Sequence, residues 1–218
     1  MSELDPAVVL RVRRQLRLVA ILSAAREAGL DPLPARQLHA VAYFADALAP
    51  VWGLRILDTQ LLKQREGPTS PILQRDVDLL VGRGILVAAS VRHVEDADGN
   101  WRLDAHYTLN DKFVNPILDA ANKLELTELP YVREVVFAMS GLGLLGIARA
   151  SALDASYGSE LVDIGGMVDI GSDPSSLNDT ARVAMRFGVL MESQVKLSAA
   201  EEVHLYVLEL YKRISYAA

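Results

Sequence analysis

Residues 67–109 read GPTSPILQRDVDLLVGRGILVAASVRHVEDADGNWRLDAHYTL, and they carry the clearest structural signals of the chain. Ser70 can cap a helix and Pro71 can occupy its first turn, so the sequence predicts a helix over Pro71–Gly82. After this helix, apolar residues recur with period two on either side of Asp98-Gly99, a pair that favours a hairpin turn. The stretch therefore predicts a helix followed by an antiparallel β-hairpin.

The two predicted strands of the hairpin each place a row of apolar side chains on one face. The rows are Ile85, Val87, Ala89 and Val91 in the first strand, and Trp101, Leu103, Ala105, Tyr107 and Leu109 in the second. Because successive side chains of a strand point to opposite faces, each row is expected to share one side of the hairpin.

Helical spacing of apolar residues predicts two helices before this stretch, over Pro6–Ala28 and Ala35–Leu48, and a short helical segment over Leu54–Gln64. Several helices followed by an antiparallel hairpin is the element order of a winged helix–turn–helix. We therefore expect residues 1–110 to form a winged-helix-like domain in which Pro71–Gly82 is the recognition helix.

The second half of the chain returns to helical patterns. Helices are predicted over Lys112–Leu124, Pro130–Met139 and Asn178–Glu192, and a last one opens at the capping box of Ser198 and Glu201. The glycine-bearing, polar stretch 165–176 is predicted to be a loop. The expected fold is mainly α with a small antiparallel β-hairpin, in which an acidic α-helical domain, residues 111–218, follows the winged helix.

Composition narrows the function classes. The chain has 218 residues, 22 Lys and Arg against 28 Asp and Glu, and no cysteine, which excludes disulfides and a cysteine nucleophile within it. Residues 1–110 hold 13 basic and 13 acidic residues, whereas residues 111–218 hold 9 and 15. A broadly basic nucleic-acid footprint is therefore absent. The longest apolar run, Val135–Ala148, is shorter than the about 20 residues of a membrane span, and we expect a cytoplasmic protein.

A glycine motif is the one signal for a cofactor. Gly141, Gly143 and Gly146 match G-x-G-x-x-G, and residues 135–139 are the candidate preceding strand, which would suit a nucleotide-dependent enzyme. A dinucleotide site also needs several βαβ units, which the sequence does not show, so a tight helix–helix contact or a bent helix in an apolar core is the favoured interpretation. The four histidines lie far apart in sequence. We expect no catalytic residue, no metal and no cofactor.

Four arginines are the candidates for contact with DNA phosphates: Arg11, Arg14 and Arg17 on the first helix and Arg75 on the recognition helix. Asp76 and Asp78 offset the positive charge of the recognition helix, and the wing tip is acidic. Because phosphate neutralisation supplies most nonspecific affinity for DNA, this balance favours protein contacts. A winged-helix transcription regulator or antitoxin remains the alternative.

Three aromatic residues are the candidate anchors of a protein interface: Trp52, Trp101 and Tyr107. Large aromatic side chains dominate the energetics of many interfaces. Packing in the core is the alternative interpretation for each of them.

Residues 38–87 read LHAVAYFADALAPVWGLRILDTQLLKQREGPTSPILQRDVDLLVGRGILV. Their order of an aromatic-acid helix, a Glu-Gly-Pro and a helix into Gly-Arg-Gly resembles the middle component of bacterial ABC-three-component conflict systems, which include Lamassu-type anti-phage defence. It resembles the Panacea antitoxin domain more weakly. The first resemblance implies a non-catalytic adaptor between an SMC/Rad50-like ABC ATPase and an effector such as a nuclease, with DNA reached through the complex. It transfers no active-site residue.

Overall fold

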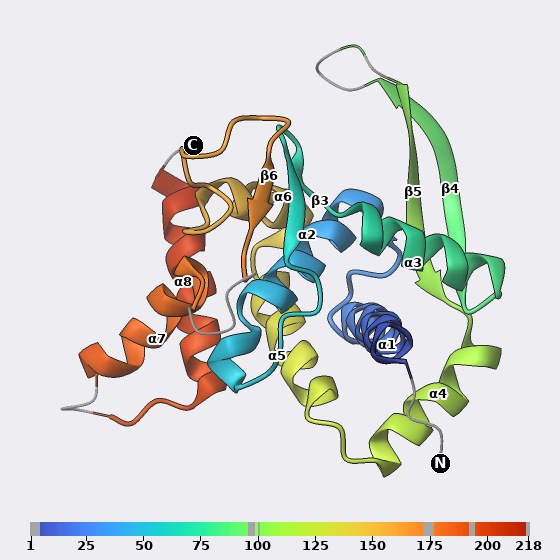
Figure 1. Cartoon of the computed structure of the whole chain (residues 1–218), viewed down its shortest axis with the longest axis horizontal. Helices are drawn as coiled ribbons and strands as arrows, with labels where there is room; N and C mark the ends of the chain where they lie inside the picture. The colour runs from blue at the N-terminus through green and yellow to red at the C-terminus, as the bar shows by residue number, and fades with distance from the viewer. Residues whose placement is uncertain (1–4, 96–98, 100, 172–176, 192–194, 217–218) are drawn as a thin grey trace.

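The computed structural model describes residues 5–95, 99, 101–171, 177–191 and 195–216. This part of the chain is mainly helical and has two small antiparallel sheets (Figure 1). The α-helices are α1 (Pro6–Glu27), α2 (Ala35–Ala47), α3 (Pro71–Gly82), α4 (Asp111–Lys123), α5 (Glu128–Ser140), α6 (Gly143–Ala150), α7 (Asp179–Met191) and α8 (Ala199–Tyr216). The strands are β1 (Leu33–Pro34), β2 (Gln60–Gln64), β3 (Gly67–Thr69), β4 (Leu86–Glu95), β5 (Trp101–Leu109) and β6 (Met167–Asp169), and the 3₁₀ turns are η1 (Ala49–Trp52) and η2 (Ser151–Leu153).

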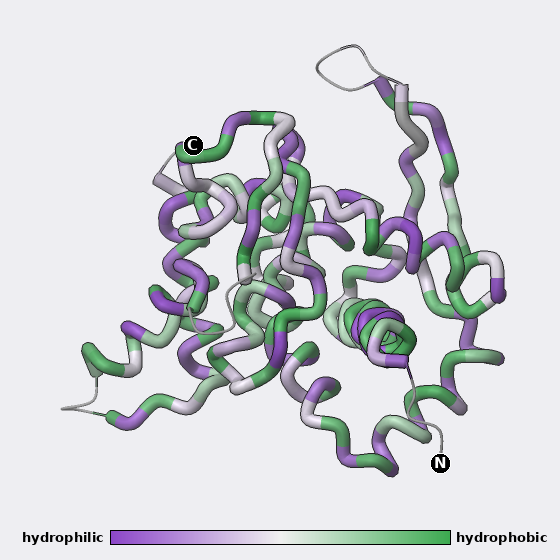
Figure 2. The backbone as a smooth tube through the Cα atoms, viewed as in Figure 1, coloured by the Kyte–Doolittle hydropathy of each residue, from purple (hydrophilic) through white to green (hydrophobic). Residues whose placement is uncertain are grey.

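Helix α1 runs through the middle of the molecule and is seen end-on in Figure 1. The side chain of Asp5 caps its first turn by accepting from the N–H of Ala7 at 2.9 Å. All residues from Leu18 to Leu22 are buried, so this stretch of the helix is enclosed on every side. Figure 2 shows that hydrophobic and hydrophilic residues are mixed around this helix. Its predicted extent is confirmed to within one residue.

The first sheet has the strand order β1-β5-β4. Leu33 of β1 pairs with Tyr107 of β5, and β4 and β5 form the predicted hairpin. Of the row predicted for β5, Ala105, Tyr107 and Leu109 are buried, whereas Trp101 is 68% exposed. Asp98 of the expected turn lies outside the described residues, and Gly99 has φ +82°.

The predicted inner face of β4 is wrong. Leu86 is buried, whereas Val87 is 43% exposed and Val91 is 57% exposed. The pairing with β5 shifts between Ala89 and Arg92, where Ser90 has φ +52°. Because Leu86 faces the core, its neighbour Val87 points outward, so the predicted row lies on the outer face already before the irregularity. The irregularity then changes the face to which later side chains point, so the outer half of β4 does not continue the alternation of its first half.

The second sheet has the order β3-β2-β6 and was not expected. Residues 54–64 do not form the predicted helical segment, because β2 pairs with β3 and, from the far end of the chain, with β6. Leu61, which pairs with Val168 of β6, is buried in this arrangement. The predicted loop 165–176 likewise contains the strand β6, and residues 172–176 lie outside the described part.

Helices α2 and α3 are joined by residues 48–70, which contain η1, β2 and β3. A helix–turn–helix joins its two helices by a tight turn of 3–4 residues. The described elements therefore contain the helices predicted over Pro6–Ala28, Ala35–Leu48 and Pro71–Gly82, and the predicted hairpin, which the unexpected strand β1 joins. The connection before α3 is long and carries two strands of the second sheet.

The predicted halves share one hydrophobic core. The cluster of buried residues extends from Leu18 of α1 to Leu210 of α8, and α5 packs against both of these helices. A boundary at residue 110 therefore does not separate two cores. The predicted helices of the second half are confirmed as α4, α5, α7 and α8, and α8 begins at the capping box, where the N–H of Ser198 donates to Glu201 at 2.7 Å.

Among the described residues, no single helix has the length and apolar character that a membrane crossing requires. One pair of helical segments, Glu128–Ser140 and Gly143–Leu153, meets the requirement by length and composition, with a bend of 108° between them. The first of these segments is α5, whose side chains Tyr131, Val132 and Val135 are fully buried.

Candidate functional site

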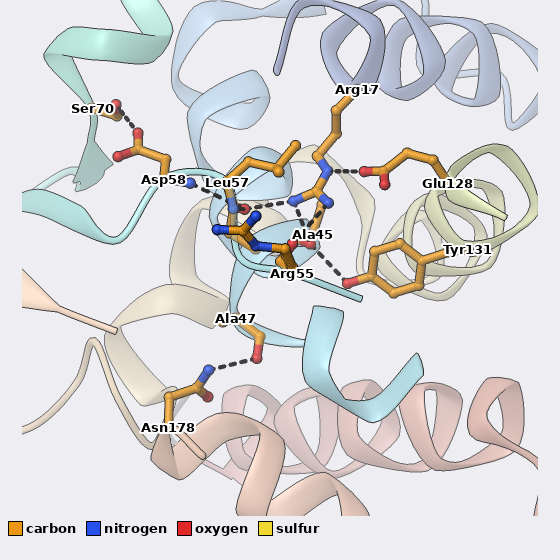
Figure 3. Close-up of polar contacts among 11 residues, drawn as sticks. Arg17, Ala45, Ala47, Arg55, Leu57, Asp58, Ser70, Glu128, Tyr131 and Asn178 are labelled. Atoms are coloured by element: carbon orange, nitrogen blue, oxygen red, sulfur yellow. Dashed lines mark hydrogen bonds and ion pairs between the residues drawn. The ribbon is translucent and has the colours of Figure 1, made fainter. Parts of the chain in front are cut away.

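Arg17 lies in the interior of the protein, where α1 meets α2 and α5 (Figure 3). Only 3% of its surface is exposed. Its Nη1 donates to Oδ1 of Asp46 at 2.5 Å and its Nε donates to Oε1 of Glu128. The guanidinium also donates to the carbonyl oxygens of Ala45 and Arg55, each at 3.3 Å. Arg17 therefore joins three helices and cannot contact a DNA phosphate, which corrects the sequence prediction.

The charges around Arg17 compensate for its burial. Burial alone lowers the pKa of Arg17, but the carboxylates of Asp46 and Glu128 outweigh this effect, and its pKa is raised. Burial raises the pKa of Asp46 to about 6, and the charge of Arg17 opposes this rise. The N–H of Leu57 donates to the same carboxylate at 2.7 Å. The cluster is a buried, hydrogen-bonded ion pair that holds helices together.

Arg14 is also occupied within the protein. Its Nε donates to Oδ2 of Asp76 on α3 at 2.7 Å, and Gln15 donates to the other oxygen of that carboxylate at 3.2 Å. Asp76 is 2% exposed. Of the four predicted phosphate contacts, Arg11 and Arg75 are therefore the two whose side chains are exposed.

The three predicted interface anchors have different environments. Trp52 is partly buried against the core, and its ring centroid lies 5.6 Å from that of Tyr131. Tyr107, in the strand β5 of the hairpin, is buried. Trp101, at the start of β5, is 68% exposed. Trp101 alone of the three has the exposure that an anchor needs, and the core interpretation holds for Tyr107 and Trp52.

A second polar cluster surrounds Asp154, which follows η2 and is 2% exposed. Its carboxylate accepts from the hydroxyl groups of Tyr206 on α8 at 2.6 Å and Thr180 on α7 at 2.8 Å. Tyr43 of α2 donates to it as well, and so does the N–H of Ser156 at 2.8 Å. Within the described residues, no lysine or arginine pairs with Asp154. Hydroxyl and backbone donors therefore satisfy this buried carboxylate and join α2, α7 and α8 around it.

Sequence reasoning missed both acidic centres. The spacing of Asp154 and Ser156 is typical of a turn in which the aspartate accepts from the N–H two residues later, and this signal was available. The pairing of Arg17 with Glu128 joins residues 111 positions apart, so no local pattern indicates it.

A third group of polar contacts fixes the start of α3. The hydroxyl of Ser70 accepts from the N–H of Leu73 at 2.9 Å, which confirms the predicted cap, and it donates to the carboxylate of Asp58. The N–H of Ser70 donates to Nδ1 of His39 at 3.2 Å. Because the other ring nitrogen lies 3.2 Å from Oε1 of Gln74, His39 is a neutral ring that donates through Nε2.

An open groove of about 650 Å³ lies between α1 and α4, beside the end of α3. Apolar side chains line most of it, including Val12 of α1, which is 55% exposed, and Leu124, directly after α4, which is 70% exposed. The charged residues that line it are Arg13 and Arg83. The groove is thus an accessible apolar surface bordered by positive charge.

The glycine motif is not arranged as a dinucleotide site. Residues 135–139, the expected strand before Gly141, belong to α5. Gly143 has φ +64°, and an added Cβ at Gly146 would lie 2.9 Å from Cβ of Leu142. Gly141 and Gly143 are exposed and lie where the chain bends by 108° between α5 and α6, which agrees with the bent-helix interpretation, whereas no close contact between two helices is seen at these glycines. In the described part of the chain, no group of three or more His, Asp or Glu residues is placed to hold a metal ion.

Comparison with known proteins assigns no family. The chain matches no protein-family model and no curated protein. The resemblance of residues 38–87 to three-component defence systems therefore stays a prediction. Geometry alone defines the candidate site. It consists of the apolar groove and of the neighbouring Arg14 and Arg17, which form ion pairs with carboxylates of the same chain.

Proposed function

We propose that the chain is a non-catalytic adaptor that binds other proteins. The observation that carries this proposal is the ion pair between Arg14 of α1 and Asp76 of α3. Arg14 was expected to contact DNA, but in this ion pair it contacts another part of the same chain. Arg17 is likewise paired with Asp46 and Glu128. The neighbouring surface is an apolar groove, which is a feature of protein contacts.

We further propose that residues 1–110 are a winged helix with an insertion. The order α1-β1-α2-α3-β4-β5 and the sheet order β1-β5-β4 support this assignment, because β1 precedes α2 and pairs beside the hairpin. The inserted segment, residues 48–70, replaces the tight turn before α3 with η1, β2 and β3. In this proposal the wing serves protein contacts, and Trp101 is its exposed aromatic residue.

The partners that we propose follow from the resemblance at residues 38–87. They are an SMC/Rad50-like ABC ATPase and an effector such as a nuclease, in a cytoplasmic anti-phage complex of a bacterium. The adaptor role requires no active-site residue in this chain. DNA would be reached through the complex, which agrees with the internal pairing of Arg14 and Arg17.

Co-purification tests the proposal. The tagged chain is co-expressed with the products of its neighbouring genes and isolated at physiological salt. The mass of the intact complex is then measured by native mass spectrometry. We expect an ABC-type ATPase to be retained in a fixed ratio. A chain that stays alone beside its co-expressed neighbours contradicts the proposed function.

The alternative is a DNA-binding regulator or antitoxin. The exposed side chains of Arg11 and Arg75 favour it, since both are accessible to the phosphates of a DNA duplex. These are only two of the four predicted phosphate contacts, because Arg14 and Arg17 form ion pairs with acidic residues of the chain. The salt dependence of duplex binding separates this function from the adaptor.

A further inference from the structure

The groove between α1 and α4 has the form of a seat for a helix. Val12, Leu16 and Val19 follow one another on α1 at spacings of four and three residues, and Ile117, Ala121 and Leu124 do so on α4 and at its end. Each set makes one continuous stripe along its helix. In Figure 1, α4 lies beside the end-on view of α1. The groove thus has two facing apolar stripes for walls.

The base and the rim of the groove differ. Val19, Leu80 and Ala121 are almost fully buried and form its base, whereas Val12 and Leu124 stand exposed at its edges. Its volume of about 650 Å³ lies within the about 300–1,000 Å³ of typical ligand sites. Several apolar side chains of a partner can therefore enter it together.

The charges at the groove are all of one sign. Arg13 and Arg83 line it, and the acidic residues on either side of its α4 wall, Asp119 and Glu125, do not. The guanidinium of Arg83 has a long contact of 3.4 Å to Gln15, and no described residue forms an ion pair with Arg13. Both arginines can therefore pair with carboxylates of an incoming chain.

We propose that this groove binds an amphipathic helix of a partner protein, whose apolar face enters between α1 and α4 and whose flanking acidic residues pair with Arg13 and Arg83. Two apolar stripes at helical spacing favour a helix as the occupant, and the two arginines select an acidic one. This inference rests on the proposed adaptor function and names one of its contact surfaces.

A display library of 18-residue helices tests the inference. Its members carry leucine at positions i, i+4, i+7 and i+11 and random Glu, Lys or Gln at the neighbouring positions. Clones are selected on the wild-type chain and counter-selected on Leu124→Glu. We expect enrichment of Glu beside the leucines, and at least a tenfold loss of affinity for these clones on Leu124→Glu. Enrichment of Lys or Gln, or no clone that Leu124→Glu weakens, overturns the inference.

Matched variants locate the binding. Leu190→Glu alters an equally exposed leucine, 69% against 70%, on α7, and it should leave the affinity unchanged. Val12→Glu repeats the groove test on the opposite wall, and circular dichroism checks that each variant is folded. The double variant Arg13→Glu/Arg83→Glu should reverse the selection from Glu to Lys. An unchanged preference for Glu would contradict the role of the arginines.

Two further outcomes separate this inference from the proposed function. A concentration-dependent dimer that Leu124→Glu abolishes identifies a second copy as the occupant and overturns the inference. If the Leu124→Glu chain retains its ATPase partner in co-purification and the library yields no groove-specific clone, the groove inference fails and the adaptor function stands. If acidic helices bind in the groove but no neighbour co-purifies, the adaptor function fails by itself.

Discussion

Arg17 of α1 and Asp46 of α2 form a buried ion pair at 2.5 Å, in which both side chains are less than 10% exposed. The carboxylate of Glu128 on α5 extends the pair, because it accepts from Nε of the same guanidinium. Helices from both predicted halves therefore meet at one charged group. This relationship explains why the first helix does not present its arginines as one basic surface.

Replacing Arg17 with Met should lower the free energy of unfolding by about 3–5 kcal/mol. The variant leaves the carboxylates of Asp46 and Glu128 without their cation, and breaking a buried pair on one side is costly. Urea denaturation followed by circular dichroism measures the change. Arg11→Ala is the matched control on an exposed arginine of the same helix, and it should stay within about 0.5 kcal/mol of wild type. Equal effects of the two substitutions would contradict the structural role of Arg17.

Local sequence patterns predict the helices well because their signals are local. The cap at Ser70 and the proline after it locate α3, and the capping box at Ser198 locates α8. By contrast, β2 depends on pairing with β6, about 100 residues later. Leu57 and Leu61, four residues apart, have the spacing of a helix, so the pattern alone favours the wrong element.

The candidate site was predicted only in part, for the same reason. Amphipathic spacing places Arg17 on the polar side of its helix, but enclosure by α2 and α5 buries that side as well. Its partner Glu128 lies in another part of the sequence. The groove arises from the placement of α4 beside α1, which no local signal of either helix contains. Internal pairing of charges is a tertiary property.

Tyr206→Phe should lower the free energy of unfolding by about 1.5–3 kcal/mol. The substitution removes the hydroxyl that donates to Asp154 at 2.6 Å, and hydrogen bonds to a charged group contribute about this much. Thermal and urea denaturation measure the loss. Tyr216→Phe, at a tyrosine of the same helix that is 90% exposed, should have no measurable effect. A Tyr206→Phe chain as stable as the Tyr216→Phe chain would show that the Asp154 cluster does not anchor α8.

His39 makes the start of α3 sensitive to acid. Burial lowers its pKa below 6.5, and its Nδ1 accepts from the N–H of Ser70, so protonation of the ring must break that bond. Since the unfolded chain then binds the proton more tightly, the contribution of His39 to stability is present above about pH 6.5 and is lost as the pH falls below it. The largest slope for one proton is about 1.4 kcal/mol per pH unit.

His39→Asn tests this dependence, because an amide oxygen can accept from Ser70 without titrating. We expect its free energy of unfolding between pH 7 and pH 5 to fall less steeply than that of wild type. His93→Asn, at an exposed histidine of β4, is the control and should keep the wild-type slope. Measurements at several pH values in urea give the slopes. A wild-type slope in His39→Asn would rule out His39 as the acid-sensitive group.

Binding to duplex DNA should depend only weakly on salt. Arg14 and Arg17 are occupied by Asp76, Asp46 and Glu128, which leaves two of the four predicted contacts, Arg11 and Arg75, to neutralise phosphates. Since each phosphate contributes about −0.9 to the slope of log affinity against log salt, the slope should be no steeper than about −2. Fluorescence anisotropy with a random-sequence duplex at 50–300 mM salt measures it.

The double variant Arg11→Ala/Arg75→Ala completes this test, because it removes the two exposed candidates and leaves the internal ion pairs intact. It should bring the slope close to zero. Arg186→Ala, an exposed arginine of α7, is the control and should leave the slope unchanged. A wild-type slope steeper than about −5 that the double variant reduces would require many phosphate contacts around α1 and α3. That result would favour the DNA-binding regulator over the adaptor, since an adaptor that reaches DNA through its partners needs no such contacts.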